Sequence, residues 1–242
     1  MFTKTDGSSH VDRTTQNIRL IALGDCNTSG INHSSVASIL HQRLNQLSKS
    51  SQTCYLDNHG EAMRTTREGL AITKDLNKSF DIALINYGLV DAWTTTIPKV
   101  YIQYYPDNRV KRILRKALKS LKKRLRKTYF NGLFKTGSVV STNEYKENID
   151  AIMTSLHQYN PNIFFILWGS VPVEDEPRNT NLLDYDNILK AQTGKYNGCY
   201  IDTRKTISAE RREDMFHDEV HLSEAAQEMI ANKILAELEV TA

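Results

Sequence analysis

Two short segments near opposite ends of the chain carry residues that could perform nucleophilic chemistry together. Cys26 follows an apolar run in "LIALGDCNTSG" (20–30), and Asp218 and His221 stand in "DEVH" (218–221). A thiol becomes an effective nucleophile when an imidazole takes its proton, and a carboxylate commonly orients that imidazole. Two residues separate Asp218 from His221, so the carboxylate and the ring can converge from one loop. This pattern predicts a nucleophilic role for Cys26.

Both segments also have a purely structural interpretation. Free cysteine is among the most buried residue types, so Cys26 could simply pack in a turn. The chain contains seven histidines, and an Asp three positions before one of them is a weak signal by itself. The interpretation therefore depends on whether the fold brings the two segments together.

Five apolar runs predict the strands of a sheet. They are rich in Ile, Leu, Phe and Tyr and do not alternate with polar residues, which is typical of parallel strands covered on both faces. The runs are "IRLIAL" (18–23), "TCYL" (53–56), "DIALINY" (81–87), "NIFFILW" (162–168) and "CYI" (199–201). Segments with helical spacing of apolar residues separate them, most clearly at 34–47, 144–159 and 223–238.

The alternation of strands and helices predicts an α/β protein, a three-layer α/β/α sandwich around a five-stranded, mostly parallel sheet. We expect a loose polar tail at 1–17 and a single domain at 18–240. Ligands of such folds sit beyond the carboxyl ends of the strands, and Cys26 directly follows the first strand. The predicted nucleophile is therefore at the expected edge.

Four sequence blocks resemble those of the SGNH/GDSL hydrolases. "GDCN" (24–27), "GLVD" (88–91) and "DEVH" (218–221) match the family's first, third and last blocks in order and separation, and "DNHGEAMRTTREGL" (57–70) stands at the second. The resemblance covers residues 18–238. It implies a flavodoxin-like sheet and an esterase or deacetylase, acting on a small acylated substrate such as an O-acylated carbohydrate, without metal or cofactor.

The resemblance also implies roles for individual residues. Cys26 stands at the position of the family's nucleophilic serine, His221 at the general base and Asp218 at its partner. The backbone N–H of Cys26 would contribute to the oxyanion hole. Gly60 matches the second-block oxyanion residue on sequence, whereas an alignment on the neighbouring Thr-Thr pair places Met63 there instead.

Two departures from the family pattern affect the expected chemistry. Cysteine replaces serine, and Val90 replaces the third-block asparagine, so one side-chain donor to the oxyanion is missing. Loss of such a donor costs roughly 10²–10³ in rate in a well-studied protease. Asn58 and Asn86 are candidate replacements, and Asp25 is expected beside them in the site.

A cysteine nucleophile would form a thioester intermediate, which can pass its acyl group to water, an alcohol or an amine. An acyltransferase is therefore the first alternative to a hydrolase. The second alternative is a catalytically degenerate binding module for an anionic partner.

A strongly basic stretch interrupts the pattern after the third strand. Eleven Lys/Arg and no Asp/Glu occur between Arg109 and Lys127, so the rest of the chain carries a net charge of −8 once these eleven are subtracted from +3. Helical spacing predicts one apolar face, formed by Val110, Ile113, Leu114, Ala117, Leu118, Leu121 and Leu125. We expect a helical insertion at about 98–138 that either packs on the domain or binds an anionic lipid or polyanion. Few aromatic residues accompany the charges, which argues against nucleic acid.

The three cysteines have unrelated spacings, which predicts neither a disulfide framework nor a zinc site. No apolar run approaches the ~20 residues of a membrane span, and the N-terminal segment has no apolar signal core. We therefore expect a cytoplasmic protein, associated at most with a membrane surface.

Overall fold

The computed structural model describes residues 17–30, 34–47, 52–95, 97, 100–127 and 137–241. The expected tail lies outside these ranges except for residue 17. Parts of the insertion expected at 98–138 also lie outside them.

A five-stranded parallel sheet forms the centre of the molecule. Its strand order is β2-β1-β3-β6-β7, with every neighbouring pair parallel. The strands are β1 (Ile18–Gly24), β2 (Cys54–Asn58), β3 (Ile82–Asn86), β6 (Phe164–Trp168) and β7 (Gly198–Ile201). All five residues of β3 are buried, as expected for the middle of a sheet covered on both faces. This order confirms the predicted α/β class and the flavodoxin-like topology.

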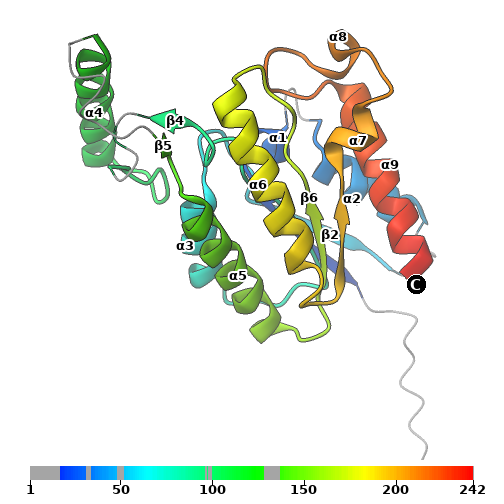
Figure 1. Cartoon of the computed structure of the whole chain (residues 1–242). Coiled ribbons are helices and arrows are strands. Elements are labelled where there is room, and N and C mark those ends of the chain that lie inside the picture. Colours follow the sequence, from blue (N-terminus) through cyan, green and yellow to red (C-terminus); the bar gives the residue numbers. More distant parts are fainter. Residues whose placement is uncertain are drawn as a thin grey trace, which may run out of the picture.

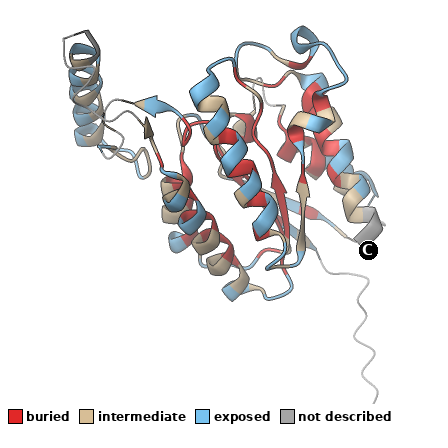
Figure 2. Cartoon of the chain, viewed as in Figure 1, coloured by how far each residue is buried: buried red, intermediate tan, exposed pale blue. Residues whose placement is uncertain are grey.

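Helices cover both faces of this sheet (Figure 1). One layer contains α3, α5 and α6, and the other contains α2 and α9 with the short α7 and α8 beside them. The helices of the two layers are α2 (Val36–Leu47), α3 (Thr66–Asp75), α5 (Thr142–Tyr159), α6 (Glu176–Gln192), α7 (Thr203–Ile207), α8 (Arg212–Met215) and α9 (Glu224–Thr241). Buried residues lie along the strands and on the inner helix faces (Figure 2). The single turn α1 (Cys26–Ser29) follows β1 directly.

Helix α3 has a strong start and an unusual packing residue. Thr65 caps it, and Thr65 and Glu68 form a reciprocal capping box. A Cβ atom at Gly69 would stand 2.7 Å from the Tyr87 ring, so glycine is required where the helix crosses the end of β3. Thr and Gly within the helix weaken its sequence signal, which explains why periodicity alone did not indicate it.

The basic insertion leaves the body between β3 and α5. Helix α4 (Arg109–Lys127) projects from one side of the molecule, next to the two-stranded antiparallel ribbon of β4 (Thr94–Thr95) and β5 (Gly137–Ser138) (Figure 1). Among the described residues of α4, none is buried (Figure 2).

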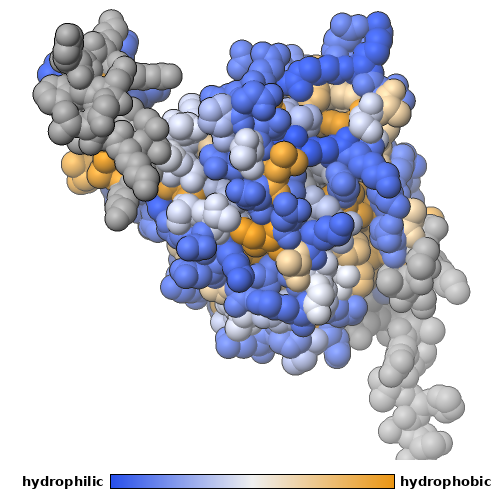
Figure 3. All heavy atoms as spheres, in the orientation of Figure 1, coloured by the Kyte–Doolittle hydropathy of each residue, from blue (hydrophilic) through white to orange (hydrophobic). Residues whose placement is uncertain are grey.

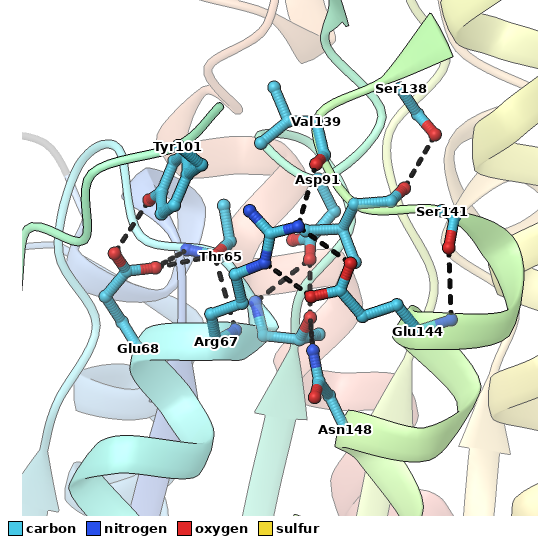
Figure 4. A network of polar contacts seen from close by, with 12 residues as sticks. Thr65, Arg67, Glu68, Asp91, Tyr101, Ser138, Val139, Ser141, Glu144 and Asn148 are labelled. Atoms are coloured by element: carbon cyan, nitrogen blue, oxygen red, sulfur yellow. Dashed lines mark hydrogen bonds and ion pairs between the residues drawn. The ribbon is translucent and has the colours of Figure 1, made fainter. Parts of the chain in front are cut away.

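A buried polar network anchors the insertion to the body (Figure 4). Glu68 accepts a hydrogen bond from Tyr101 Oη at 2.7 Å. It also accepts one from the Tyr104 backbone N–H at 2.7 Å. On the other side, Arg67 donates to Glu144 and to the backbone carbonyl of Val139. These contacts fix both ends of the insertion against α3, beside the carboxyl edge of the sheet.

Candidate active site

Cys26 is the first residue of α1 and lies immediately beyond the carboxyl end of β1. Its side chain is half-buried. Asp25 caps the turn, and its carboxylate accepts hydrogen bonds from the backbone N–H groups of Asn27, at 3.1 Å, and of Leu89. Burial raises the pKa of Asp25 to about 6, against the opposing effect of these N–H donors.

The Cys26 thiol is protonated at neutral pH. Burial and then the adjacent Asp25 carboxylate raise its pKa well above the usual range, although the backbone N–H groups of Cys26 and Asn27 and the Arg178 guanidinium oppose that rise. Within the described residues, no hydrogen bond joins the Cys26 thiol to the His221 imidazole, and the Nδ1 atom of that imidazole pairs with Asp218. At rest the site therefore holds a neutral thiol.

Asp218 and His221 are joined as their spacing predicted. Asp218 Oδ2 lies 2.6 Å from His221 Nδ1, and Oδ1 accepts from the backbone N–H groups of Val220 and His221 at 2.9 and 2.8 Å. Partial burial acts to raise the pKa of Asp218, but the His221 side chain and the two N–H donors lower it to about 2. Asp218 is therefore ionised at neutral pH, and it fixes the imidazole through Nδ1 and leaves Nε2 free to act on a proton.

Asn27 joins the two halves of the site, a role that no sequence pattern indicates. Its Nδ2 donates to the Val220 carbonyl at 3.1 Å, and its Oδ1 accepts from the Leu222 N–H at 3.0 Å. These two backbone groups flank His221. The residue directly after Cys26 thus holds the backbone on both sides of His221 against α1.

The second block offers two different backbone amides. The Gly60 N–H donates to Asn58 Oδ1 at 2.8 Å, and Asn58 Nδ2 donates to the Thr28 carbonyl at 3.2 Å. These donors therefore have partners within the fold. Met63 has a φ of 65°, a left-handed conformation that glycine adopts far more easily, and its N–H has no hydrogen-bond partner among the described residues.

The third block is built around buried side chains. Val90 is 5% exposed, and Asn86 Nδ2 donates to the Trp168 and Gly169 carbonyls at 2.9 and 3.2 Å. The Asn86 amide therefore ties the end of β3 to the end of β6. Burial raises the pKa of Asp91 to about 7, although two hydrogen bonds from Thr66 oppose that rise.

Arg178 of α6 brings a positive charge into the site. Its Nε and Nη2 donate to the Leu89 carbonyl at 3.1 and 2.5 Å, next to Val90, and its guanidinium stands 5.6 Å from the centroid of the Trp93 ring. Leu89 also donates its N–H to Asp25, so Arg178 reaches the surroundings of Cys26 through one intervening residue. No sequence pattern indicates Arg178, because it lies about 150 residues after Cys26 in the chain and reaches the site only through the fold.

Among the described residues, no group of three or more His, Cys, Asp or Glu could hold a metal ion. No helix in the described ranges is long and apolar enough to cross a membrane.

Several solved structures are similar to this chain in fold. No protein-family model matches the chain, and no curated protein matches it in sequence. TesA superposes with a TM-score of 0.60 at 14% identity, covering 93% of this chain and 99% of that chain. A catalytic mutant of Axe2, an acetylxylan esterase from Geobacillus stearothermophilus, gives 0.61 at 15% identity, covering 91% and 94%. A lipase/acylhydrolase from Enterococcus faecalis gives 0.56 at 16% identity, covering 93% and 96%. The chain therefore has the fold of the GDSL/SGNH hydrolases.

A second catalytic mutant of Axe2 is similar as well, with a TM-score of 0.60 at 16% identity, covering 91% of this chain and 94% of that chain. The two mutants of that esterase are changed at an Asp and at a His, three positions apart.

Proposed function

We propose that this protein is an SGNH-like acyl-ester hydrolase that works through Cys26, His221 and Asp218. The observation that carries the proposal is the pair formed by Asp218 and His221, held against α1 by Asn27. The fold and the equally spaced Asp and His of the esterase Axe2 support it.

The proposed reaction has two halves. His221 Nε2 takes the thiol proton while Sγ attacks the ester carbonyl carbon, because the neutral thiol is a poor nucleophile until that proton leaves. The tetrahedral intermediate expels the alkoxide, which receives the proton from His221, and an acyl thioester remains on Cys26. Water, deprotonated by His221, then attacks the thioester, and the proton returns to the departing thiolate. Catalytic hydrogen bonds often tighten only when substrate is bound, so the missing Cys26–His221 bond is compatible with this route.

The oxyanion in this proposal is bound by the backbone N–H groups of Cys26 and Met63. The first N–H of a helix has no intrahelical acceptor, and the Met63 N–H has no partner among the described residues. Arg178 supplies positive charge at Leu89 in place of the donor that Val90 lacks. Gly60, Asn58 and Asn86 stay candidates for substrate contact, but the hydrogen bonds that they make in this structure serve the fold.

Kinetics with p-nitrophenyl acetate test the proposal. We expect Cys26→Ala and His221→Ala to lower kcat by roughly 10³-fold or more, and Cys26→Ser to keep part of the activity. Cys199→Ala is the matched control, because it removes another half-buried thiol outside the site. Full turnover by Cys26→Ala would exclude the cysteine as nucleophile.

Two alternatives have observations in their favour. A thioester also supports an acyltransferase, and added alcohol acceptors would then increase the release of p-nitrophenol. A non-catalytic binding module is favoured by the raised pKa of Cys26, and such a protein would show no turnover above the Cys26→Ala background.

We also propose that α4 binds an anionic lipid surface. The structure exposes much of its apolar stripe: Val110 is 65% exposed, Ile113 67%, and Leu114 and Leu121 49% each. Apolar surface is visible at this edge of the molecule in Figure 3. An exposed apolar stripe on a helix rich in Lys and Arg is typical of helices that lie in a membrane interface.

A further inference from the structure

A groove of about 580 Å³ lies between α4 and the body. Its volume is within the range of small-molecule sites. Met63 and Val90 form part of its wall, and both belong to the blocks that surround the proposed oxyanion. Cys26, Asp218 and His221 are not part of the lining, so the groove borders the proposed oxyanion residues and not the catalytic side chains.

The walls of the groove are apolar on the side of the body. Trp93, Val100, Ile102 and Val139 line it together with Val90. Trp93 is 47% exposed and Val100 42%, so apolar surface remains open to a ligand. Val90 stands where the resembling family has a polar residue, and here it continues the apolar wall.

Helix α4 turns its positive side toward this groove. Five cations and one apolar residue of the helix line it: Arg112, Arg115, Lys116, Leu118, Lys119 and Lys122. The most exposed apolar residues of the helix, Val110, Ile113, Leu114 and Leu121, are not part of this lining. Helical geometry makes the two sets distinct, since residues three and four apart share a face. The helix therefore presents mainly cations to the groove, with Leu118 among them, while the exposed part of its apolar stripe faces away.

Two of these cations are available to a ligand. Asp107 is the acidic residue of the lining, and it pairs with Arg112 and Arg115. Lys116 and Lys119 are exposed and have no acidic partner among the described residues. A ligand that fits must combine an apolar segment with a negative group.

We infer that the groove binds an anionic amphiphile, with its apolar segment along the Val100–Ile102 wall and its acidic group at Lys116 and Lys119. This inference rests on the proposed ester hydrolysis in one respect: it makes acyl esters that carry an apolar segment and an acidic group the substrate class. The binding itself requires no catalysis.

Calorimetric titration of the Cys26→Ala protein tests the inference with three probes below their micelle concentrations. Dodecyl phosphate carries both features, dodecyl maltoside carries only the chain, and inorganic phosphate carries only the charge. We expect dodecyl phosphate to bind with one-to-one stoichiometry, at least about tenfold more tightly than either of the others. Equal binding of dodecyl phosphate and dodecyl maltoside, or of dodecyl phosphate and inorganic phosphate, would overturn it.

Variants locate the binding. Lys116→Gln combined with Lys119→Gln should weaken dodecyl phosphate binding by about tenfold or more, because charge-assisted hydrogen bonds are lost. Ile102→Ser should weaken it through the apolar wall. Arg109→Gln combined with Lys123→Gln is the matched control, since both residues are exposed on the same helix and outside the groove lining.

If the control loses as much affinity as the lining variant, the helix attracts anions unspecifically and the inference fails. Because binding is measured without the Cys26 thiol, a failure of the proposed hydrolysis would leave this result unchanged. If the protein turns over p-nitrophenyl acetate but does not bind dodecyl phosphate, the proposed ligand of the groove is refuted and the proposed hydrolysis stands.

Discussion

Asp25 and Cys26 are neighbours in the chain, and their ionisation is coupled. The Asp25 carboxylate is the second cause, after burial, of the raised pKa of the thiol. Asn is as good a helix cap as Asp, so Asp25→Asn keeps the acceptor for Asn27 while removing the charge. The pKa of Cys26 should fall in this variant.

Alkylation by iodoacetamide measures this change. We expect Asp25→Asn to raise the rate at Cys26 several-fold at pH 8, because each pKa unit changes the small thiolate fraction about tenfold. Peptide mass analysis separates Cys26 from Cys54 and Cys199. Asp186→Asn is the control: it also removes a buried carboxylate with a raised pKa, but one that does not act on Cys26. Equal rates for the two variants would contradict the coupling.

Asn27 is predicted to be a positioning residue. Asn27→Ala removes both hydrogen bonds to the backbone around His221, and the resulting misplacement of the imidazole should lower kcat by about 10–100-fold with little change in KM. Asn160→Ala is a close control, because Asn160 likewise donates to a carbonyl (Phe80) and accepts from an N–H (Asn162), at the other end of the sheet. It should lower stability and leave kcat unchanged; a similar loss of kcat in both variants would reduce Asn27 to a structural role.

At the scale of elements, α4 shows what periodicity can and cannot predict. The spacing of its apolar residues predicted the helix and its amphipathic character, and the observed bounds are Arg109–Lys127. It could not predict which side would face the body, because that depends on where the 100–107 segment docks. Glu68 decides this docking by accepting hydrogen bonds from Tyr101 and Tyr104, a contact across more than thirty residues.

The outward stripe of α4 gives a testable prediction. Wild-type protein should co-sediment with anionic vesicles at low salt, and less so at 0.5 M salt, because screening then limits each charge to roughly a few ångströms. Ile113→Ser combined with Leu121→Ser should weaken this binding severalfold by removing apolar contact. Leu47→Ser combined with Leu183→Ser, which changes two exposed leucines on other helices, should leave it unchanged. Equal binding to neutral vesicles, or no effect of the stripe variant, would favour another role for the helix.

At the scale of the whole molecule, buried carboxylates should govern stability against pH. Burial raises the pKa of Asp25 and Asp186 to about 6 and of Asp91 to about 7, above the ordinary value of 3.8. The folded state therefore binds these protons more tightly than the unfolded state. Their contribution to stability is fully present below about pH 4 and is lost as pH rises through 6 and 7. Asp218, whose pKa is lowered to about 2, stabilises the folded state above about pH 4, and this contribution is lost as the pH falls toward 2.

Asp91→Asn isolates one of these groups. Its side chain can still accept from Thr66, and it is neutral at every pH. The variant and the wild type should differ in their free energy of unfolding, and the difference should depend on pH. The variant should gain more stability over the wild type at pH 8 than at pH 5, by on the order of 1 kcal/mol or more. Thermal melts at the two pH values measure this, and Asp150→Asn, an exposed carboxylate, is the control. A change that is the same at both pH values would contradict a raised pKa in the folded protein.

The sequence determined the topology more completely than the site. Continuous apolar runs mark parallel strands that are covered on both faces, so the five strands of the central sheet could be predicted. Their flavodoxin-like order was implied by the resemblance to the SGNH/GDSL hydrolases. Local patterns also predicted the Asp218–His221 pair, because both residues belong to one loop. Three features of the site could not be predicted, since each depends on elements that meet only in the folded chain. They are the contacts of Asn27, the position of Arg178 and the backbone conformation of Met63.

Intact-mass spectrometry after brief mixing with p-nitrophenyl acetate tests the central claim most directly. A nucleophilic Cys26 forms an acetyl thioester, so the wild-type protein should gain one acetyl group, which a peptide map places on Cys26 and which hydroxylamine removes. Cys26→Ala should gain none, and His221→Ala should acquire it far more slowly. Turnover of the ester with no acetyl group on Cys26 at any mixing time, or equal acetylation of Cys199, would contradict the proposed mechanism.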